Sequence, residues 1–446
     1  MSGVRHWWGL RPRGTAVAAL LAVGLMAGVG PASAGAASVP VVHTDPADGT
    51  WWYDALDGSQ LAALGATGAG VEVAVVDAGI SPTIPLLADA RLTVYAPATC
   101  LDEVGVPTSV AVGSELSDAT SHGTNIVGMI AGSGAGVSGV APDADVSFYA
   151  TAADDWTPCV RDADGGDVGF AQAVVHAVDD GARILSLSIG TLDTPTRAAL
   201  AWALHQGVVV VAAIGNFDGD DDTLPMVNGL VAVQAEDADQ QPEGTGTSSG
   251  PVRHDHVTVT APGIDLRMQG NLLTGSWAGS SLGTGTSFAA PLVAGLLADL
   301  AQRYPRATGN QLVQDLVATA FAPDGADPAV VGYGQVDPVR MLQLDPTTLP
   351  DVNPLLADQP HADGDLTPQD VAAATRPDLP DVGWTSVEAA TASDPAPASV
   401  VGAQRSGPTQ VHAAAVGLAV GAVALGAVGL RRRRRRKPAA SGDPHG

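Results

Sequence analysis

Residues 71–79, VEVAVVDAG, decide the fold. The run is apolar except for Glu72 and ends on an acid that is followed by alanine and glycine. A continuous apolar run of this length is typical of a strand buried on both faces, as in parallel sheets covered by helices. Asp77, at the end of such a strand, would lie in a crevice at the carboxyl ends of the strands. The stretch predicts an α/β domain with its site at that end of the sheet.

The segment from about residue 55 to residue 345 continues this alternation of apolar runs and amphipathic stretches. We predict further strands over 145–149, 183–188, 208–213 and 231–234. We predict helices over 168–180, 194–206, 287–303 and 309–320. Strands that alternate with helices indicate a three-layer α/β fold, in which a mostly parallel sheet carries helices on both faces.

Three more polar residues stand at strand ends or helix starts. His122 lies in SHGTNIVG (121–128), where small residues let a helix begin against neighbouring backbone. Asn216 follows the predicted strand 208–213. Ser287 opens a predicted helix, with Pro291 in its first turn, where a missing N–H costs little. Each residue alone has an ordinary interpretation: a core histidine, a turn asparagine and a helix-capping serine.

Together these residues suit acyl transfer. Histidine moves protons near neutral pH, and a serine at a helix N-terminus has backbone donors for a developing oxyanion. The chain order Asp, His, Asn, Ser is that of the subtilisin triad with its oxyanion asparagine. From about 60 to 340 the chain resembles the subtilisin family, in VVDAG (75–79), SHGT (121–124) and GTSFAAP (285–291), with lesser matches at 139–142, 261–263 and 332–334.

The resemblance implies a serine endopeptidase that needs no cofactor. Ser287 would attack the peptide carbonyl, His122 would carry the proton, and Asp77 would orient the imidazole. The Ser287 N–H and Asn216 would form the oxyanion hole. Ala78 departs from the family, which usually has Thr or Ser there, and we expect the geometry to survive this change.

Substrate contacts are also implied by the resemblance. Residues 186–190 would line the cleft and pair with the substrate backbone as an added strand. Ser188, Ile189 and Gly190 would lie beside the first side-chain pocket. The substrates would be proteins or peptides.

Both ends of the chain predict contact with a membrane. Residues 1–34 combine three arginines, an apolar run over 16–29 and the small residues 32–34, which is typical of a cleaved signal peptide. Residues 411–430 contain one polar side chain, His412, and are long enough to span a bilayer. Seven basic residues follow at 431–437, which places the tail 431–446 in the cytoplasm and the rest of the mature chain outside.

Between these ends we predict an N-terminal arm (35–59), a peptidase domain (60–345) and a stalk rich in Pro, Asp and Ala (346–410). The tryptophans and tyrosine at 51–53 would pack the arm onto the domain. Gly417 and Gly421 form a small-xxx-small pattern that favours a partner helix in the membrane.

Composition excludes other functions. The 446-residue chain has a net charge of −26, and residues 35–430 carry 46 acidic and 11 basic side chains. Such a surface repels phosphate backbones, which excludes nucleic acid as a partner. The two cysteines, Cys100 and Cys159, permit one disulfide in an exported protein.

Metal binding has weak signals. His254 and His256 flank Asp255, but no further ligand follows at a familiar spacing, so we expect no metal there. The acidic run 218–222 offers oxygen ligands that suit calcium. A solvated acidic loop is the preferred interpretation.

The whole architecture resembles the mycosins, the membrane-bound subtilisins of type VII secretion systems. That resemblance implies a cell-membrane protease that associates with subunits of the secretion complex. Two alternatives remain: a structural subunit that stabilises the complex with little need for proteolysis, and a general surface-degrading protease.

Overall fold

The fold is described from a computed structural model. It describes residues 46–387 except 98–99, 102–106, 109–111, 114, 134–138, 153–155, 157, 161–167, 191, 217–223, 225–226, 248, 357–364 and 381–382. The predicted signal peptide, membrane span and basic tail lie outside the described residues, as do Gly417, Gly421 and the acidic run 218–222.

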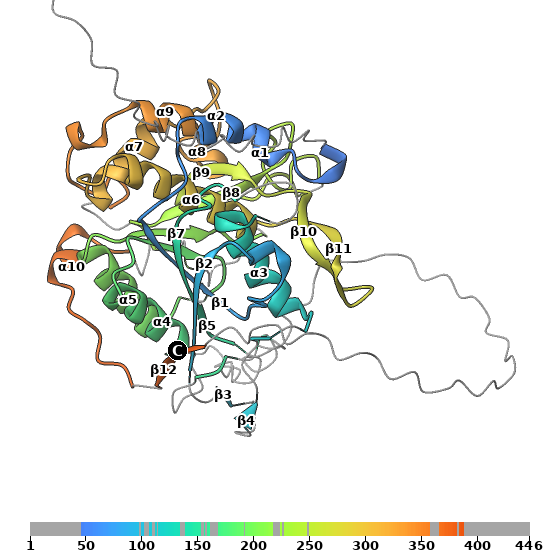
Figure 1. Ribbon diagram of the computed structural model, residues 1–446. Helices are drawn as coiled ribbons and strands as arrows, with labels where there is room; N and C mark the ends of the chain where they lie inside the picture. Colours follow the sequence, from blue (N-terminus) through green and yellow to red (C-terminus); the bar gives the residue numbers. More distant parts are fainter. Residues whose placement is uncertain are drawn as a thin grey trace, which may run out of the picture. The chain divides into compact units, whose positions relative to one another are not determined.

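β1 (Glu72–Asp77), the strand predicted from residues 71–79, lies inside an eight-stranded sheet. The strand order is β12-β2-β5-β1-β6-β7-β8-β9 (Figure 1). All neighbours pair in parallel except β12, which is antiparallel to β2. The other strands are β2 (Arg91–Pro97), β5 (Asp145–Ala150), β6 (Ile184–Leu187), β7 (Val209–Ala213), β8 (Val231–Glu236), β9 (Val257–Pro262) and β12 (Trp384–Val387).

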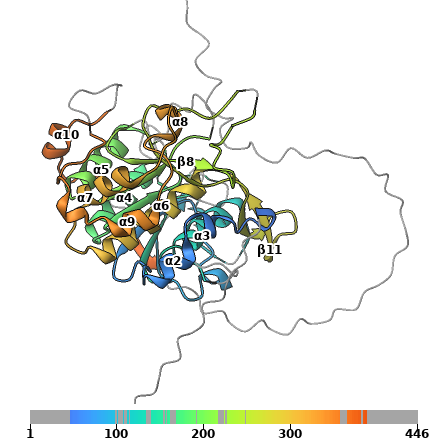
Figure 2. The ribbon, with the colours of Figure 1, turned by 90° about the horizontal axis from the view of Figure 1, so that it is seen from above.

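Helices cover both faces of this sheet. Successive β1 side chains point to opposite faces, and both sets are apolar, so each face packs against helices. Val73 and Val75 pack into a core with residues of α3 (Asp118–Ala131), α6 (Thr286–Arg303) and α7 (Gly309–Thr319). Ala74 and Val76 pack into a second core with α4 (Val168–Asp179) and α5 (Thr194–His205), which lie side by side in both ribbon views (Figures 1 and 2). The predicted three-layer α/β fold is confirmed.

The strands and helices predicted with both bounds match the observed ones to within about two residues at each end. The helix expected to begin just after His122 is α3, which begins earlier, at Asp118. The sequence analysis did not identify β2, β9, β12 or the hairpin of β10 (Leu266–Asn271) and β11 (Ser276–Gly283). It also left out the short elements, which are β3 (Cys100–Leu101), β4 (Pro107–Thr108), α1 (Trp52–Ala55), α2 (Gly58–Ala63), α8 (Pro328–Val331), α9 (Pro338–Gln343) and α10 (Pro368–Ala373), with 3-10 turns at Pro46–Asp48, Pro85–Leu87 and Pro346–Thr348.

The described part of the N-terminal arm, residues 46–59, packs on the domain as expected. Trp51, Trp52 and Tyr53 are each at most 7% exposed and belong to the core that contains α6. The Trp51 indole N–H donates to the Ile264 carbonyl at 3.3 Å, and Arg267 N donates to the Gly49 carbonyl at 2.8 Å. These contacts fix the arm beside the β10–β11 hairpin.

The segment after residue 345 differs from the prediction of an extended stalk. β12 pairs with β2 at the sheet edge, and the His256 imidazole contacts the fully buried Asp365 carboxyl at 3.0 Å. Asn228 Oδ1 accepts a hydrogen bond from Leu366 N at 2.6 Å. Because these groups find partners in the domain, the stalk prediction is wrong for the described residues 346–387. Residues 388–410 lie outside the described part.

Among the described residues, no helix combines the length and apolar character that crossing a membrane requires.

Asp315 of α7 generates a stability prediction. The residue is fully buried, and neither carboxyl oxygen has a hydrogen-bond partner among the described residues. Burial raises the pKa of Asp315 to about 8. Since the folded state holds this proton more tightly than the unfolded state, its contribution to stability is lost as pH rises from about 4 to about 8.

We therefore expect Asp315→Asn to gain stability over the wild type by an amount that grows with pH across this window, reaching roughly 1–3 kcal/mol at pH 8. Urea unfolding at pH 4.5, 6 and 8 measures the difference, with Asp324→Asn as an exposed control. A difference that stays constant with pH would contradict the assignment.

Candidate active site

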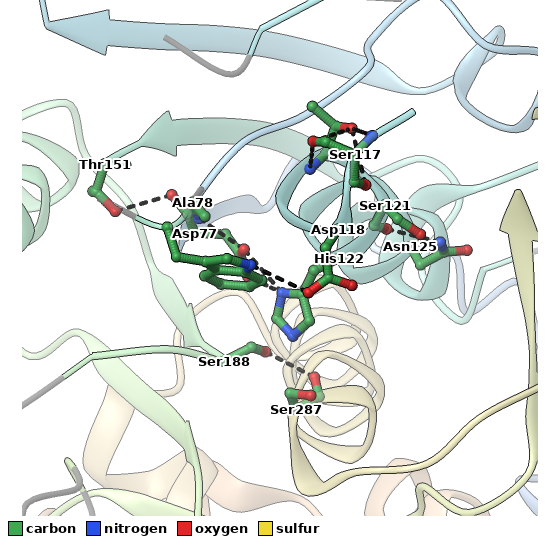
Figure 3. Close-up of polar contacts among 12 residues, drawn as sticks. Asp77, Ala78, Ser117, Asp118, Ser121, His122, Asn125, Thr151, Ser188 and Ser287 are labelled. Atoms are coloured by element: carbon green, nitrogen blue, oxygen red, sulfur yellow. Dashed lines mark hydrogen bonds and ion pairs between the residues drawn. The ribbon is translucent and has the colours of Figure 1, made fainter. Parts of the chain in front are cut away.

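Asp77 ends β1 and is fully buried. Its Oδ1 accepts a hydrogen bond from Ala78 N at 2.7 Å, and its backbone carbonyl accepts from Thr151 N and Thr151 Oγ1 at 2.9 and 3.0 Å. His122, on α3, places Nδ1 2.9 Å from Asp77 Oδ1 and 3.0 Å from Oδ2 (Figure 3). The structure therefore brings Asp77 and His122 together and fixes the carboxyl group on both sides.

The start of α3 is fixed by local chemistry. Ser117 and Thr120 form a capping box, each side chain accepting from the backbone N–H of the other. The helix then approaches the end of β1 so closely that a Cβ on Gly123 would lie 2.2 Å from the Gly79 carbonyl oxygen and 2.8 Å from the Phe148 ring. Only glycine at this position lets His122 reach Asp77.

The electrostatic setting favours the protonated imidazole. Burial lowers the pKa of His122, but the charge of Asp77, the hydrogen bond to it and the charge of Asp118 together outweigh burial and raise the pKa above 6.5. In the neutral imidazole, the same contact with Asp77 selects the tautomer that carries its proton on Nδ1. Nε2 is then free to accept a proton. Figure 3 shows Nε2 directed toward Ser287, with no hydrogen bond drawn between the two side chains.

Ser287 is the second residue of α6. Pro291, four residues on, lies inside this helix and not in its first turn as predicted. Since proline has no N–H, it leaves the Ser287 carbonyl without its helical donor. The Ser188 hydroxyl supplies that hydrogen bond at 2.8 Å (Figure 3). The segment after β6 is thereby bonded to the residue that carries the candidate nucleophile.

Asn216 follows β7 and faces the start of α6. Its Oδ1 accepts from Thr286 N at 2.9 Å and from Thr286 Oγ1 at 3.1 Å, and Thr286 Oγ1 also bonds the Ile214 carbonyl. A backbone N–H can only donate, so this contact assigns the amide oxygen to Thr286 and leaves Nδ2 as a donor. An added Cβ on Gly285 would lie 3.3 Å from Ser287 Oγ and 3.4 Å from Asn216 Oδ1.

Ser188, Ile189 and Gly190 follow β6 directly. Ile189 packs against the core of α4 and α5. Gly190 has φ +131°, and a Cβ there would lie 2.7 Å from the Phe170 ring and 2.9 Å from Leu224. The hydrogen bond of Ser188 places this segment beside Ser287, and its role toward substrate stays a prediction.

The remaining predicted residues are also placed. Cys100 and Cys159 form a disulfide bond. His254 Nε2 lies 3.3 Å from the Gly215 carbonyl, next to Asn216, while His256 contacts Asp365. The two imidazoles therefore contact different segments, His254 the residues after β7 and His256 the segment that precedes α10.

Sequence reasoning missed Thr286, Asp118 and Trp156. Thr286 stands next to Ser287, and Asp118 lies one helical turn before His122, so spacing could have indicated both. The Trp156 ring lies 5.3 Å from the His122 ring, centroid to centroid, and its indole N–H donates to Asp118 at 3.2 Å. No spacing signal points to Trp156, because the fold brings it to α3.

Comparison with known proteins extends these observations. Residues 68–334 match the model of the subtilase family. Mycosin-1 of Mycolicibacterium smegmatis is 29% identical over 392 residues, covering 74% of this chain and 82% of the relative. Mycosin-1 of Mycobacterium tuberculosis is 32% identical over 330 residues, covering 63% and 70%. The structure of MycP3 protease from the type VII (ESX-3) secretion system is similar with a TM-score of 0.50 and 28% identity, covering 67% and 89%.

The pKa of His122 can be measured directly. We expect its imidazole signals to titrate in heteronuclear NMR with a midpoint above 6.5, because Asp77 and Asp118 stabilise the cation. Asp118→Asn removes one of these charges, so it should lower the midpoint, whereas Asp324→Asn at an exposed turn should not. A midpoint at or below 6.5 in the wild type would contradict this account.

Proposed function

The chain belongs to the subtilase family, and from this premise we propose that it is a serine endopeptidase that acts through Asp77, His122 and Ser287. One observation carries the proposal: Nδ1 of His122 contacts the buried carboxyl of Asp77 while Nε2 is directed toward Ser287 at the N-terminus of α6 (Figure 3). This is the arrangement that an activated serine requires.

In the proposed reaction, Ser287 Oγ attacks the carbonyl carbon of the scissile peptide as His122 Nε2 takes the hydroxyl proton. Asp77 holds the imidazole by Nδ1 and stabilises the imidazolium that forms. His122 then gives the proton to the leaving amine, and the C–N bond breaks to leave an ester on Ser287. Water deprotonated by His122 hydrolyses the ester and regenerates the hydroxyl.

The negative oxygen of each tetrahedral intermediate needs donors that are already in place. Two groups support this role. The Ser287 N–H is among the first backbone donors of α6, which lack a partner within the helix. The Asn216 amide is oriented by Thr286, so Nδ2 is its remaining donor group.

Substrate binding is proposed for the segment after β6. Ser188, Ile189 and Gly190 directly follow β6, and Ser188 is bonded to Ser287, so we propose that a substrate strand pairs with the backbone of this segment. The substrates are then unfolded or extended stretches of protein, a class that fits an endopeptidase.

Covalent labelling tests the nucleophile. We expect a fluorophosphonate probe to label the wild type once, and Ser287→Ala to abolish labelling because the attacking oxygen is gone. Ser280→Ala, on β11, is the matched control and should label normally. If the wild type fails to label, the proposed activity is wrong.

Removal of the second oxyanion donor tests the mechanism separately. We expect Asn216→Ala to lower kcat by about 10²–10³-fold with a small change in KM, the effect of losing such a donor in subtilisin. Steady-state peptidase kinetics measures the split, with Asn310→Ala on α7 as control. An unchanged kcat in Asn216→Ala would exclude this residue from the oxyanion hole.

The cellular setting is a further part of the proposal. We propose an exported, single-pass membrane protein with its domain outside and its tail in the cytoplasm, working with a type VII secretion complex. The signal-like residues 1–34, the apolar run 411–430 and the similarity to mycosins support it. The alternative, a subunit needed for assembly and not for cleavage, is favoured by the same apolar run with Gly417 and Gly421.

Secretion assays separate these two roles. If cleavage is the required activity, Ser287→Ala should stop export of the substrates of the secretion system as fully as deletion of the gene. If secretion survives Ser287→Ala and is lost only on deletion, the subunit role is supported. Membrane fractionation of the wild-type and Ser287→Ala strains checks that the variant is present at the normal level.

A further inference from the structure

Three alanines form a small apolar platform beside the Asp77–His122 pair. Ala78 follows β1, Ala119 lies in the first turn of α3 and Ala152 follows β5, and each is at most 5% exposed. Trp156 and Ile189 pack against this platform. Because alanine has only a methyl group, an indole can lie close to the backbone at the end of β1.

Trp156 is held in place by several independent contacts. Its indole N–H donates to Asp118 Oδ2 at 3.2 Å, and Asp118 precedes His122 by one turn of α3. The indole meets the His122 ring edge-on, at 5.3 Å between centroids and 69° between planes. A bound N–H and an apolar platform together define one position for the indole.

The backbone of Trp156 itself has an unusual conformation, and Cys159 nearby in the chain is tied to the domain. Trp156 has φ +66°, a left-handed conformation that is costly for a bulky side chain and persists where the surroundings determine it. Three residues later, Cys159 is bonded to Cys100, and Cys159 N donates to the Thr151 carbonyl at 2.9 Å. Thr151 also donates to the backbone carbonyl of Asp77, so Cys159 is connected through Thr151 to the end of β1.

The His122 ring lies between two aromatic side chains. Phe288, next to Ser287, has its ring centroid 5.7 Å away, and Trp156 supplies the second contact. The imidazole side chain is 16% exposed, and within the described residues its only hydrogen bonds are those of Nδ1 with Asp77. The contacts with Trp156 and Phe288 therefore limit how far the imidazole can rotate while Nδ1 stays bonded to Asp77.

We propose that Trp156 is a positioning residue for His122: seated on Ala78, Ala119 and Ala152 and bonded to Asp118, its indole keeps the imidazole with Nδ1 on Asp77 and Nε2 toward Ser287. The inference rests on the proposed serine peptidase function. It assigns a role to Trp156, and it gives the small side chain of Ala78 a reason, since a larger one would displace the indole.

The test measures inactivation of the full-length protein in detergent by diisopropyl fluorophosphate, which is too small to depend on an extended substrate cleft. We expect Trp156→Ala to lower the second-order rate constant about 10-fold and Trp156→Phe about 3-fold, because phenylalanine keeps a ring edge but has no N–H. Trp202→Ala on α5 is the matched control and should leave the rate unchanged. A rate for Trp156→Ala within twofold of the wild type would overturn the proposal.

A second readout separates positioning from general damage to the fold. In the wild type, the Nδ1 proton of His122 should give a sharp, far-downfield NMR signal, and in Trp156→Ala it should broaden or vanish while the thermal midpoint changes by only a few degrees. Retention of that signal would overturn the proposal. Failure of the wild type itself to react with the reagent would instead refute the peptidase function.

Coupling between Ala78 and Trp156 provides a further test. Ala78→Thr adds two heavy atoms beneath the indole, so we expect about a 10-fold slower inactivation in the wild-type background and little further loss when Trp156 is already alanine. Non-additivity of this kind is the mark of residues in contact. Fully additive losses would show that the platform does not act through Trp156.

Discussion

The bond between Asp77 and His122 is the interaction on which the rest of the site depends. It joins the end of a buried strand to the second turn of a helix, between residues 45 positions apart in the chain. An ionised carboxyl group without exposure to solvent is costly unless donors within the protein stabilise it. Ala78 N and the imidazole supply them, and Thr151 fixes the adjacent carbonyl. The helix can come this close because residue 123 is a glycine.

The other half of the site depends on the start of α6. Thr286 orients Asn216, and Pro291 leaves the Ser287 carbonyl for the Ser188 hydroxyl. A proline that would weaken an ordinary helix thus allows Ser188, in the segment proposed to bind substrate, to bond the residue proposed as the nucleophile. The carboxyl ends of β1, β6 and β7 lie near α3 and α6 at the same end of the sheet, as expected for parallel α/β folds.

The local pattern was sufficient to predict β1, β5, β6, β7 and β8 and the four long helices 168–180, 194–206, 287–303 and 309–320, because buried strands and amphipathic helices differ in period. Local pattern alone left Asp77, His122, Asn216 and Ser287 with ordinary interpretations. Their chain order and the resemblance to subtilisins singled them out as candidates, and their catalytic roles stay a prediction. The local pattern failed for β12, a four-residue edge strand whose residues gain their structure by pairing with β2. The sequence pattern did not indicate Trp156 for a similar reason, because its partners Asp118 and His122 are distant in sequence.

The segment 346–387 shows the same limit. Its Pro- and Asp-rich composition is typical of a linker, yet Asp345 and Thr367 cap short helical turns, and buried Asp365 binds His256. Composition does not reveal a partner such as His256, because it lies about a hundred positions earlier in the chain. The tether that we propose for the chain therefore begins after an edge strand of the catalytic sheet.

The most direct test of the central claim is a crystal structure of the protein after reaction with diisopropyl fluorophosphate. The account predicts a phosphoryl group on Ser287 Oγ, with one phosphoryl oxygen about 3 Å from both Asn216 Nδ2 and Ser287 N, and with His122 still bonded to Asp77. An adduct on another residue, or a phosphoryl oxygen turned away from Asn216, would contradict it.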